Sequence, residues 1–220
     1  MPILKLYGQK QASCTRRAAT ILHELKVPFE LITVDMVGMK TPAYLEHQPF
    51  GQIPYIDDNG FELYESRAIC RYLVATYGPT SGLIPTEAKA HARFEQAASI
   101  ELTNFDPYAS KAGLQLWTLK PEAKIYNLPL DKTVVETNLA ILDQKLEAYD
   151  AILGKQRYLG GETLTLADLF HLPYGPLASS GENDIMNKRS NVSRWYNELI
   201  ARPSWLAYDD ADKVKTTLSY

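Results

Sequence analysis

The sequence predicts a small α/β domain over residues 1–78, a linker at 79–86 and an all-helical domain over 87–220. Two observations carry this prediction. Short β-prone runs alternate with amphipathic helices only at the start of the chain, and beyond them apolar residues recur only at helical spacing. Between the two parts stands GPTSGLIP, whose two prolines and two glycines interrupt both patterns.

The composition is that of an ordinary globular protein, with 45% hydrophobic residues, 22% charged residues and a net charge of −3. This charge gives no reason to expect nucleic acid or an anionic membrane as a partner. There is no apolar stretch of about 18 residues, and the N-terminus lacks the pattern of a secretory leader. Two cysteines without a CxxC pair suit a reducing compartment, so we expect a cytoplasmic protein.

The first elements form a βαβ unit. ILKLYG (3–8) and FELITVDM (29–36) are β-prone, and the second alternates apolar and polar residues. Between them, SCTRRAATILHELKV (13–27) has the apolar spacing of an amphipathic helix, at Ala18, Ile21, Leu22 and Leu25. The two strands of such a unit are expected to be parallel.

A hairpin and a helix complete the first domain. Asn59-Gly60 lies between two β-prone runs in IPYIDDNGFELYES (53–66), which is a strong hairpin signal. SRAICRYLVATYG follows as a helix that begins near Ser66 and ends near Gly78. The resulting order, βαβ–ββα, is that of a thioredoxin-like fold.

The second domain is predicted to be helical. One apolar stripe predicts a helix that ends near Gly154, and TLAD (165–168) has the form of a capping box that opens another. RPSW (202–205) is expected to end a further helix. The stripe consists of Val135, Leu139, Leu142, Leu146, Tyr149 and Leu153.

Four motifs along nearly the whole chain resemble glutathione transferases of the phi class and related fungal transferases. They are PFGQIP (49–54), LYESRAICRYL (63–73), FDPYASK (105–111) and TLADL (165–169). The resemblance implies an enzyme that binds glutathione in the first domain as a co-substrate. It also implies a homodimer, in which one chain's α/β domain meets the other chain's helical domain.

The resemblance assigns a set of glutathione-binding residues. Pro54 is expected to be cis, so that the backbone of Ile53 pairs with the cysteinyl unit, while Gln52 binds the peptide portion. Glu65 and Ser66 open a helix whose free N–H groups suit the γ-glutamyl carboxylate. On residue types alone, Pro54 could equally be a turn proline, and Ser66 could be a simple helix cap.

Lys40 matches a lysine that holds the glycyl carboxylate in the phi class. The family usually has histidine before it and a second lysine after it, whereas this chain has Met39 and Thr41. Lys40 could therefore also be an ordinary surface lysine, and Arg67 could be either a ligand contact or a structural ion-pair partner.

Transferases of this type activate the glutathione thiol with a hydroxyl at the start of the first helix, and Ser13 is the candidate here. In many phi-class sequences the serine falls one residue earlier, opposite Ala12, so Ser13 could instead be a plain N-cap. Thr15 is the second candidate donor, and Tyr7, in the strand, is a remote third.

Cys14 supports a rival reading, because a cysteine in this turn would favour a mixed disulfide with glutathione. That chemistry belongs to omega-type thioltransferases, which remove glutathione from proteins. Cys70 is expected in the core. The four histidines have no metal-ligand spacing, so no metal site is predicted; they are His23, His47, His91 and His171.

The acceptor substrate is expected between the domains, beside the helix that carries FDPYASK. Tyr108, Lys111, Trp117 and Tyr174 are candidates for its walls, and each could equally be core or surface. Asp168 is read as a structural helix cap.

The expected activity is conjugation of glutathione to small electrophiles, with reduction of peroxides as a possible addition. One alternative is a non-catalytic carrier (a ligandin) of aromatic compounds, for which fourteen tyrosines and three tryptophans offer flat apolar walls. The other is a Cys14-dependent thioltransferase.

Overall fold

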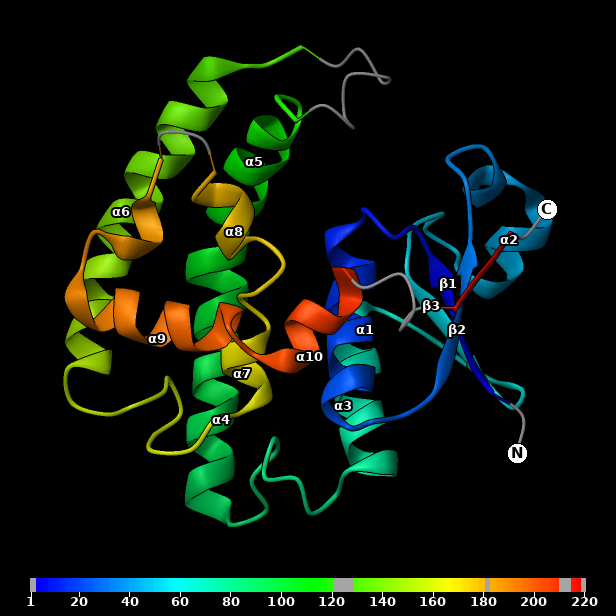
Figure 1. The fold of residues 1–220 in the computed structure, drawn as a ribbon, viewed down its shortest axis with the longest axis horizontal. Helices are drawn as coiled ribbons and strands as arrows, with labels where there is room; N and C mark the ends of the chain where they lie inside the picture. Colours follow the sequence, from blue (N-terminus) through cyan, green and yellow to red (C-terminus); the bar gives the residue numbers. More distant parts are fainter. Residues whose placement is uncertain (1–2, 121–128, 181–182, 210–214, 219–220) are drawn as a thin grey trace. The chain divides into compact units, whose positions relative to one another are not determined.

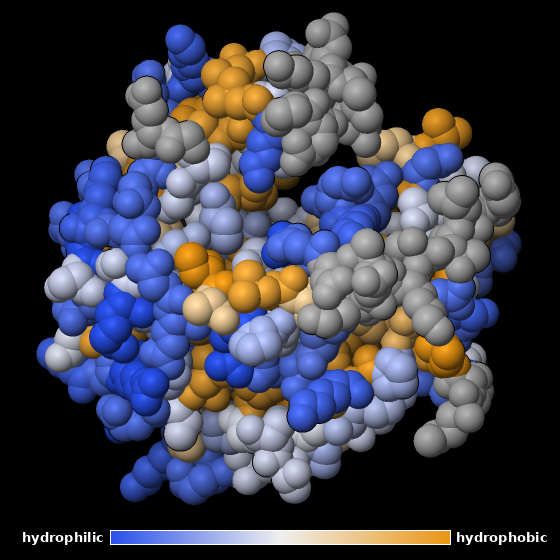
Figure 2. Space-filling view, viewed as in Figure 1, coloured by the Kyte–Doolittle hydropathy of each residue, from blue (hydrophilic) through white to orange (hydrophobic). Residues whose placement is uncertain are grey.

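The computed structural model describes residues 3–120, 129–180, 183–209 and 215–218. The chain divides into two compact units. Unit 1 comprises Met1–Ile84 together with Ala201–Tyr220, and unit 2 comprises Pro85–Ile200. Figure 2 shows that hydrophilic residues cover much of one face of the molecule, with apolar residues between them. No helix among the described residues combines the length and the apolar character needed to cross a membrane.

Unit 1 is built on one five-stranded sheet, in the strand order β4-β3-β1-β2-β5. The pair β1/β2 is parallel, as predicted, and β3 runs antiparallel to both β1 and β4. The βαβ–ββα order of a thioredoxin-like domain is therefore confirmed. The strands are β1 (Leu4–Gly8), β2 (Phe29–Thr33), β3 (Tyr55–Asp58), β4 (Phe61–Tyr64) and β5 (Lys215–Leu218).

Helices cover both faces of this sheet (Figure 1). Helices α1 (Ser13–Glu24) and α3 (Ser66–Tyr77) lie side by side on one face, and α2 (Pro42–His47) lies on the other. The side chains of a strand alternate between the two faces, so Leu6 and Ile56 are fully buried beneath one layer. Tyr7 belongs to the opposite face, where its ring stacks on Tyr55 with 4.2 Å between centroids.

Local turn chemistry explains the hairpin. Asn59 and Gly60 both have positive φ angles, 56° and 90°, which a type I′ turn requires and which these residue types tolerate best. The Asp57 carboxylate accepts a hydrogen bond from the Gly60 N–H over 2.7 Å. The short helix α2 was not predicted, although Thr41 caps it by accepting from the Tyr44 N–H and Pro42 stands at its first position.

The end of the chain departs from the prediction that residues 87–220 form one helical domain. Residues from Ala201 onward belong to unit 1, and β5 extends its sheet by pairing in parallel with β2. The returning segment includes α10 (Pro203–Leu206), which begins within the predicted helix end RPSW. The boundary between the units falls at Ile84–Pro85.

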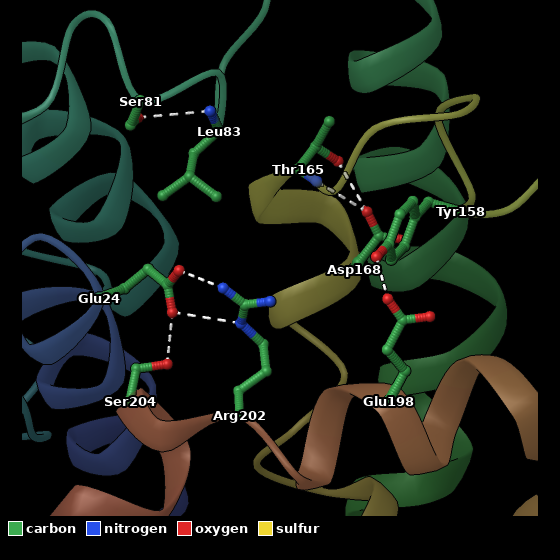
Figure 3. Close-up of polar contacts among 9 residues, drawn as sticks. All are labelled: Glu24, Ser81, Leu83, Tyr158, Thr165, Asp168, Glu198, Arg202 and Ser204. Atoms are coloured by element: carbon green, nitrogen blue, oxygen red, sulfur yellow. Dashed lines mark hydrogen bonds and ion pairs between the residues drawn. The ribbon is translucent and has the colours of Figure 1, made fainter.

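Two polar clusters attach this returning segment to α1. Arg202 donates to both carboxylate oxygens of Glu24, and Ser204 donates to one of them (Figure 3). At the other end of α1, the Arg16 guanidinium lies 3.5 Å above the Trp205 ring and pairs with Asp209 at 2.7 Å. The segment therefore packs as a structural part of unit 1.

The regular elements among the described residues of unit 2 are all helical. The predicted stripe lies on α6, where all of its members are buried except the half-buried Leu139. A short π-helical segment, Glu101–Phe105, joins α4 to α5. The elements are α4 (Ala88–Ile100), α5 (Asp106–Trp117), α6 (Lys132–Leu153), α7 (Leu166–Leu169), α8 (Gly175–Ala178), the 3-10 turn Ile185–Asn187 and α9 (Ser190–Ile200).

The predicted capping box is confirmed at the start of α7. The Asp168 carboxylate accepts from the Thr165 N–H at 2.9 Å and from the Thr165 hydroxyl at 3.0 Å (Figure 3). It also accepts from the Leu159 N–H and the Trp195 indole N–H. Asp168 thereby joins three segments of unit 2, and its role is structural.

Candidate active site

The candidate residues of unit 1 meet where the β3–β4 hairpin begins and ends. In that hairpin Tyr55 pairs with Tyr64, so the 52–54 loop and the start of α3 adjoin the same end of the ladder. The Arg17 guanidinium donates to the Ser66 hydroxyl over 2.9 Å, which brings the first turns of α1 to the same place. Three separate segments, the 52–54 loop, the start of α3 and the start of α1, thus form one candidate site.

The loop before β3 is held from both sides. The Ile53–Pro54 peptide bond is cis, which confirms that prediction. The carbonyl of Gln52 accepts from the Tyr44 hydroxyl at 2.7 Å, and its N–H donates to the buried Gln48 side chain at 3.1 Å. The Gln52 side chain is exposed, and Ile53 precedes the strand ladder, which begins at Tyr55.

Lys40 is hydrogen-bonded to the segment just before this loop. Its ammonium group donates to the Gly51 carbonyl over 2.7 Å, while the side chain as a whole remains exposed. Gly51 has a φ of 59°, and a Cβ there would lie 2.8 Å from the Lys40 nitrogen and 2.9 Å from the Met39 carbonyl oxygen. Only glycine fits this position without displacing Lys40. A contact of Lys40 with a glycyl carboxylate remains a prediction.

Glu65 and Ser66 occupy the start of α3, as predicted. Glu65 is the N-cap and has a φ of 70°, a left-handed conformation that is uncommon for glutamate and is often found at functional sites. Its side chain is exposed and makes no capping hydrogen bond. Ser66 is the first helical residue and is 7% exposed, so a small part of it reaches the surface.

At the start of α1 the structure separates the three hydroxyl candidates. The N-cap is Ala12, which has no side-chain acceptor, so the alternative reading of Ser13 as an N-cap is wrong. Ser13 is the first helical residue and is half-buried. Thr15 is fully buried and its hydroxyl accepts from the Gln9 N–H, while Tyr7 lies on the opposite face of the sheet. Ser13 alone is both in this turn and accessible.

Sequence reasoning missed Arg17. It is 2% exposed, and besides Ser66 it contacts the Cys14 sulfur, with 3.7 Å from Nη1 to Sγ. A signal was present, because Arg17 stands four residues before Ile21 and eight before Leu25, on the apolar face of α1. A cation on an apolar helical face is either paired in the interior or functional.

The two cysteines lie in different environments. Cys14 is half-buried at the second position of α1, within reach of the Arg17 guanidinium. Cys70 is fully buried on α3, as predicted, and burial raises the pKa of its thiol to about 12. Only Cys14 is therefore placed for thiol chemistry.

The acceptor candidates all belong to unit 2, but they do not share one face. Tyr108 and Lys111 are three residues apart on α5 and lie on the same side of it. Trp117 is nine residues after Tyr108, which places it on the opposite side of the same helix. Tyr174 is 8% exposed and precedes α8, which packs against α5.

The histidines serve packing and polar contacts. His171 is buried, and its Nε2 lies 3.1 Å from the Tyr149 hydroxyl. His47 pairs with Glu62 at 2.7 Å, and His23 packs edge-on against Phe29. Within the described part of the chain, no group of three His, Cys, Asp or Glu side chains is arranged to hold a metal ion.

Chemically, the site offers a hydroxyl and a thiol at the start of one helix, the N-terminus of another, and a cis-proline loop that leads into a strand. Helix N-termini attract anions, because their first N–H groups are not bonded within the helix. Such a site suits an extended peptide that carries a carboxylate at one end and a nucleophilic atom in the middle.

Comparison with known proteins agrees with this description. Residues 6–81 match the family model described as "Glutathione S-transferase, N-terminal domain", and residues 69–203 match "Glutathione S-transferase, C-terminal domain". The chain belongs to the glutathione S-transferase family. The predicted resemblance and the predicted enzyme class are thereby confirmed.

Similar members of the glutathione S-transferase family come from plants and a fungus. Glutathione S-transferase PM239X14 of Arabidopsis thaliana is 42% identical over 202 residues, which cover 89% of this chain and 91% of the relative. Glutathione S-transferase hmp2 of Hypomyces subiculosus is 42% identical over 93% of this chain and 96% of its own. The crystal structure of glutathione transferase F2 from Populus trichocarpa is 35% identical, with a TM-score of 0.87 over 96% of this chain and 99% of that one.

Proposed function

We propose that this glutathione S-transferase conjugates glutathione to small electrophilic compounds, and that Ser13 activates the glutathione thiol. The observation that carries the assignment of Ser13 is the geometry of the first turn of α1. An accessible hydroxyl stands at the first helical residue, behind an N-cap alanine that has no side-chain acceptor. The Ser13 hydroxyl would donate to an external acceptor, and a thiolate is such a group.

The energy required is within reach of this arrangement. A free thiol has a pKa near 8.5, so only about 3% is ionised at pH 7. Lowering the pKa by about two units requires about 2.7 kcal/mol of preferential stabilisation of the thiolate. A hydroxyl hydrogen bond to an anion and a helix N-terminus each supply about 1–2 kcal/mol. The hydroxyl and the helix N-terminus together can supply the required energy without a charged side chain.

The other parts of glutathione would then bind to the 52–54 loop and to the start of α3. The Ile53 backbone would pair with the cysteinyl unit, Gln52 would contact the peptide portion, and Glu65 and Ser66 would receive the γ-glutamyl carboxylate. A ligand of this kind has precedent in a similar protein. Glutathione S-transferase I, which is 29% identical with a TM-score of 0.83, has been solved with bound lactoylglutathione.

Ultraviolet absorbance of the thiolate tests the assignment of Ser13. Glutathione is added at about pH 6.5 to the wild type, to Ser13→Ala and to a matched control, Cys14→Ser. We expect a thiolate band in the wild type and in the Cys14 variant, and its loss in Ser13→Ala. A band of full size in Ser13→Ala would exclude Ser13 as the donor, and a wild type that binds glutathione without a band would refute thiol activation.

One observation favours the Cys14 alternative. The buried Arg17 guanidinium lies 3.7 Å from the Cys14 sulfur, and Cys14 stands in the first turn of α1. In a Cys14 enzyme the Cys14 sulfur would attack the disulfide of a glutathionylated substrate, so that the substrate thiol leaves and a Cys14–glutathione disulfide forms. The thiol of a second glutathione would then attack that disulfide, which frees Cys14 and releases oxidised glutathione. The activity of such an enzyme on a glutathionylated substrate would survive Ser13→Ala and disappear in Cys14→Ser, the reverse of the pattern expected for conjugation.

The residues that contact the electrophilic substrate are proposed from their residue types. Tyr108 and Lys111 share one side of α5 and are the first candidates for contact with the electrophile, whereas Trp117 faces away from them. A carrier protein would bind a fluorescent aromatic dye without conjugating a generic electrophile, and the same two measurements distinguish it from an enzyme. Peroxide reduction, a homodimer and a cytoplasmic location remain predictions.

A further inference from the structure

The Arg17 guanidinium is a buried charge that the proposed reaction does not use. It lies on α1 four residues after Ser13 and is 2% exposed. A buried guanidinium loses its hydration and is costly unless its contacts replace it. One of those contacts is the hydrogen bond from Nη1 to the Ser66 hydroxyl, 2.9 Å long and itself buried.

This hydrogen bond has only one possible direction. A guanidinium carries donors and no acceptor, so the Ser66 oxygen must be the acceptor and Arg17 the donor. The single hydroxyl proton of Ser66 cannot point at Arg17, and it is left to donate to another group. A carboxylate, which only accepts, is a suitable partner for that proton.

The positive charge of Arg17, like the orientation of the Ser66 hydroxyl, favours an anion at the start of α3. Ser66 is the first residue of α3, where the N–H groups and the helix dipole already favour an anion. Arg17 adds a full positive charge within hydrogen-bond distance of the Ser66 hydroxyl. Because the guanidinium is buried, solvent screens this charge less than it screens a surface cation.

The neighbouring arginine on the same helix provides a contrast. Arg16 points to the returning segment of the chain, where it pairs with Asp209 and covers Trp205. Arg17 points inward to α3 and contacts the side chains of Ser66 and Cys14. Two adjacent residues of one type therefore lie in different surroundings, and only Arg17 contacts the candidate site.

We propose that Arg17 is a positioning residue of the glutathione site, which orients the Ser66 hydroxyl as a donor to the γ-glutamyl carboxylate. The inference rests on the proposed function, since it takes Ser66 as the residue that receives this carboxylate. It adds that Ser66 depends on a buried cation from another helix. Arg17 does not touch the ligand and acts through Ser66.

A double-mutant cycle with a thiol-free ligand tests this role. S-methylglutathione retains the γ-glutamyl carboxylate but cannot form a thiolate, and its affinity is measured by calorimetric titration. The proteins are the wild type, Arg17→Gln, Ser66→Ala and the double variant. We expect Arg17→Gln to weaken binding about tenfold when Ser66 is present and less than about twofold in the Ser66→Ala background. Arg16→Gln, the matched control, should stay within about twofold of the wild type.

An equal loss of affinity in both backgrounds would overturn the proposal, because Arg17 would then act only through the stability of the fold. The same conclusion would follow from an unchanged affinity in Arg17→Gln. If Arg17→Gln does not fold, Arg17→Lys takes its place in the cycle. It retains the charge but not the forked donor set, and we expect a loss of at least about threefold that again requires Ser66. A loss that is the same with and without Ser66 would contradict the role.

This cycle and the thiolate measurement can fail independently. Coupling between Arg17 and Ser66 in a protein that shows no thiolate band would support the present inference and refute the proposed activation. A normal thiolate band without coupling between Arg17 and Ser66 would support the proposed activation and refute the present inference. A wild type that does not bind S-methylglutathione at all would refute the present inference, while the thiolate band with glutathione would still decide the proposed activation.

Discussion

Replacing Asp168 by asparagine should destabilise the protein far more than the size of the change suggests. The carboxylate is fully buried in unit 2 and accepts four hydrogen bonds, of which Figure 3 draws the two from Thr165. One oxygen accepts from the Leu159 N–H at 2.9 Å and the Trp195 indole at 3.0 Å, and the other accepts twice from Thr165. Burial raises the pKa of Asp168, although these donors act in the opposite direction.

The expected loss follows from counting the bonds that survive. In Asp168→Asn the amide oxygen can keep the bonds from Leu159 and Trp195, but the amide nitrogen then faces the Thr165 N–H, so two donors meet. A buried N–H without an acceptor costs about 1–3 kcal/mol, and the two remaining bonds lose their charged acceptor. We expect Asp168→Asn to lower the free energy of unfolding by about 2–4 kcal/mol. Asp168→Ala removes all four bonds and should cost more.

Urea unfolding of the full chain, followed by far-UV circular dichroism, measures this loss. Asp143→Asn is the matched control in the same unit. Its carboxylate pairs with Arg189 at 2.7 Å but is 36% exposed, and such pairs contribute about 0–1 kcal/mol. Equal losses in the two variants would refute the reasoning, because burial and the four donors would then have no measurable effect.

Three further predictions concern unit 1. Gly51→Ala should weaken glutathione binding about tenfold, because an added Cβ would clash with its neighbours and displace the loop. The left-handed backbone at this position would also cost alanine about 1–2 kcal/mol. Arg202→Ala should lower the free energy of unfolding by about 1–2 kcal/mol, since it removes a two-point contact with the partly buried Glu24. A thiol reagent at pH 8 should modify Cys14 in the native protein and Cys70 only after denaturation, because burial raises the Cys70 pKa to about 12.

Each of these has a specific control. Gly60→Ala imposes similar backbone strain, with a φ of 90°, but its Cβ would meet nothing within 4 Å, so glutathione affinity should not change. Arg157→Ala removes an arginine whose pair with Glu198 is more exposed, and it should cost less than Arg202→Ala. Two thiols modified at equal rates in the native protein would contradict the assigned burial of Cys70.

Elements fixed by neighbouring residues were predictable from the sequence. Asn59-Gly60 forms the hairpin turn because both residues tolerate positive φ, and Thr165 and Asp168 cap α7 within four residues. The apolar stripe of α6 was recognisable because helical spacing repeats over several turns. In each case the residues that determine the structure are close in the chain.

The parts that depend on distant contacts were not predictable in the same way. Nothing in the four residues of β5 indicates that they pair with β2, about 180 residues earlier in the chain. The segment before it is attached by Arg202 and Ser204 to Glu24, and no local pattern relates those residues. Short strands at a chain end carry little periodicity, and their pairing is a property of the folded sheet.

The candidate site combines both kinds of information. The family resemblance indicated the cis peptide bond before Pro54 correctly, and the helix start at Glu65–Ser66 was indicated by the serine at that position. Neither signal indicated how these segments meet. The inward direction of Arg17 could have been suspected from its helical face, but its partner on α3 could not.

The position of Ser13 shows why a one-residue shift matters and why it had to be resolved in three dimensions. The turn after β1 is fixed by Thr15, whose buried hydroxyl accepts from the Gln9 N–H and packs against Gly8. In this turn Ala12 is the N-cap and Ser13 is the first helical residue. A serine at the cap would use its oxygen on the helix's own N–H groups. A serine one residue later does not act as the cap, which is compatible with the proposed donation of its hydroxyl proton to a thiolate.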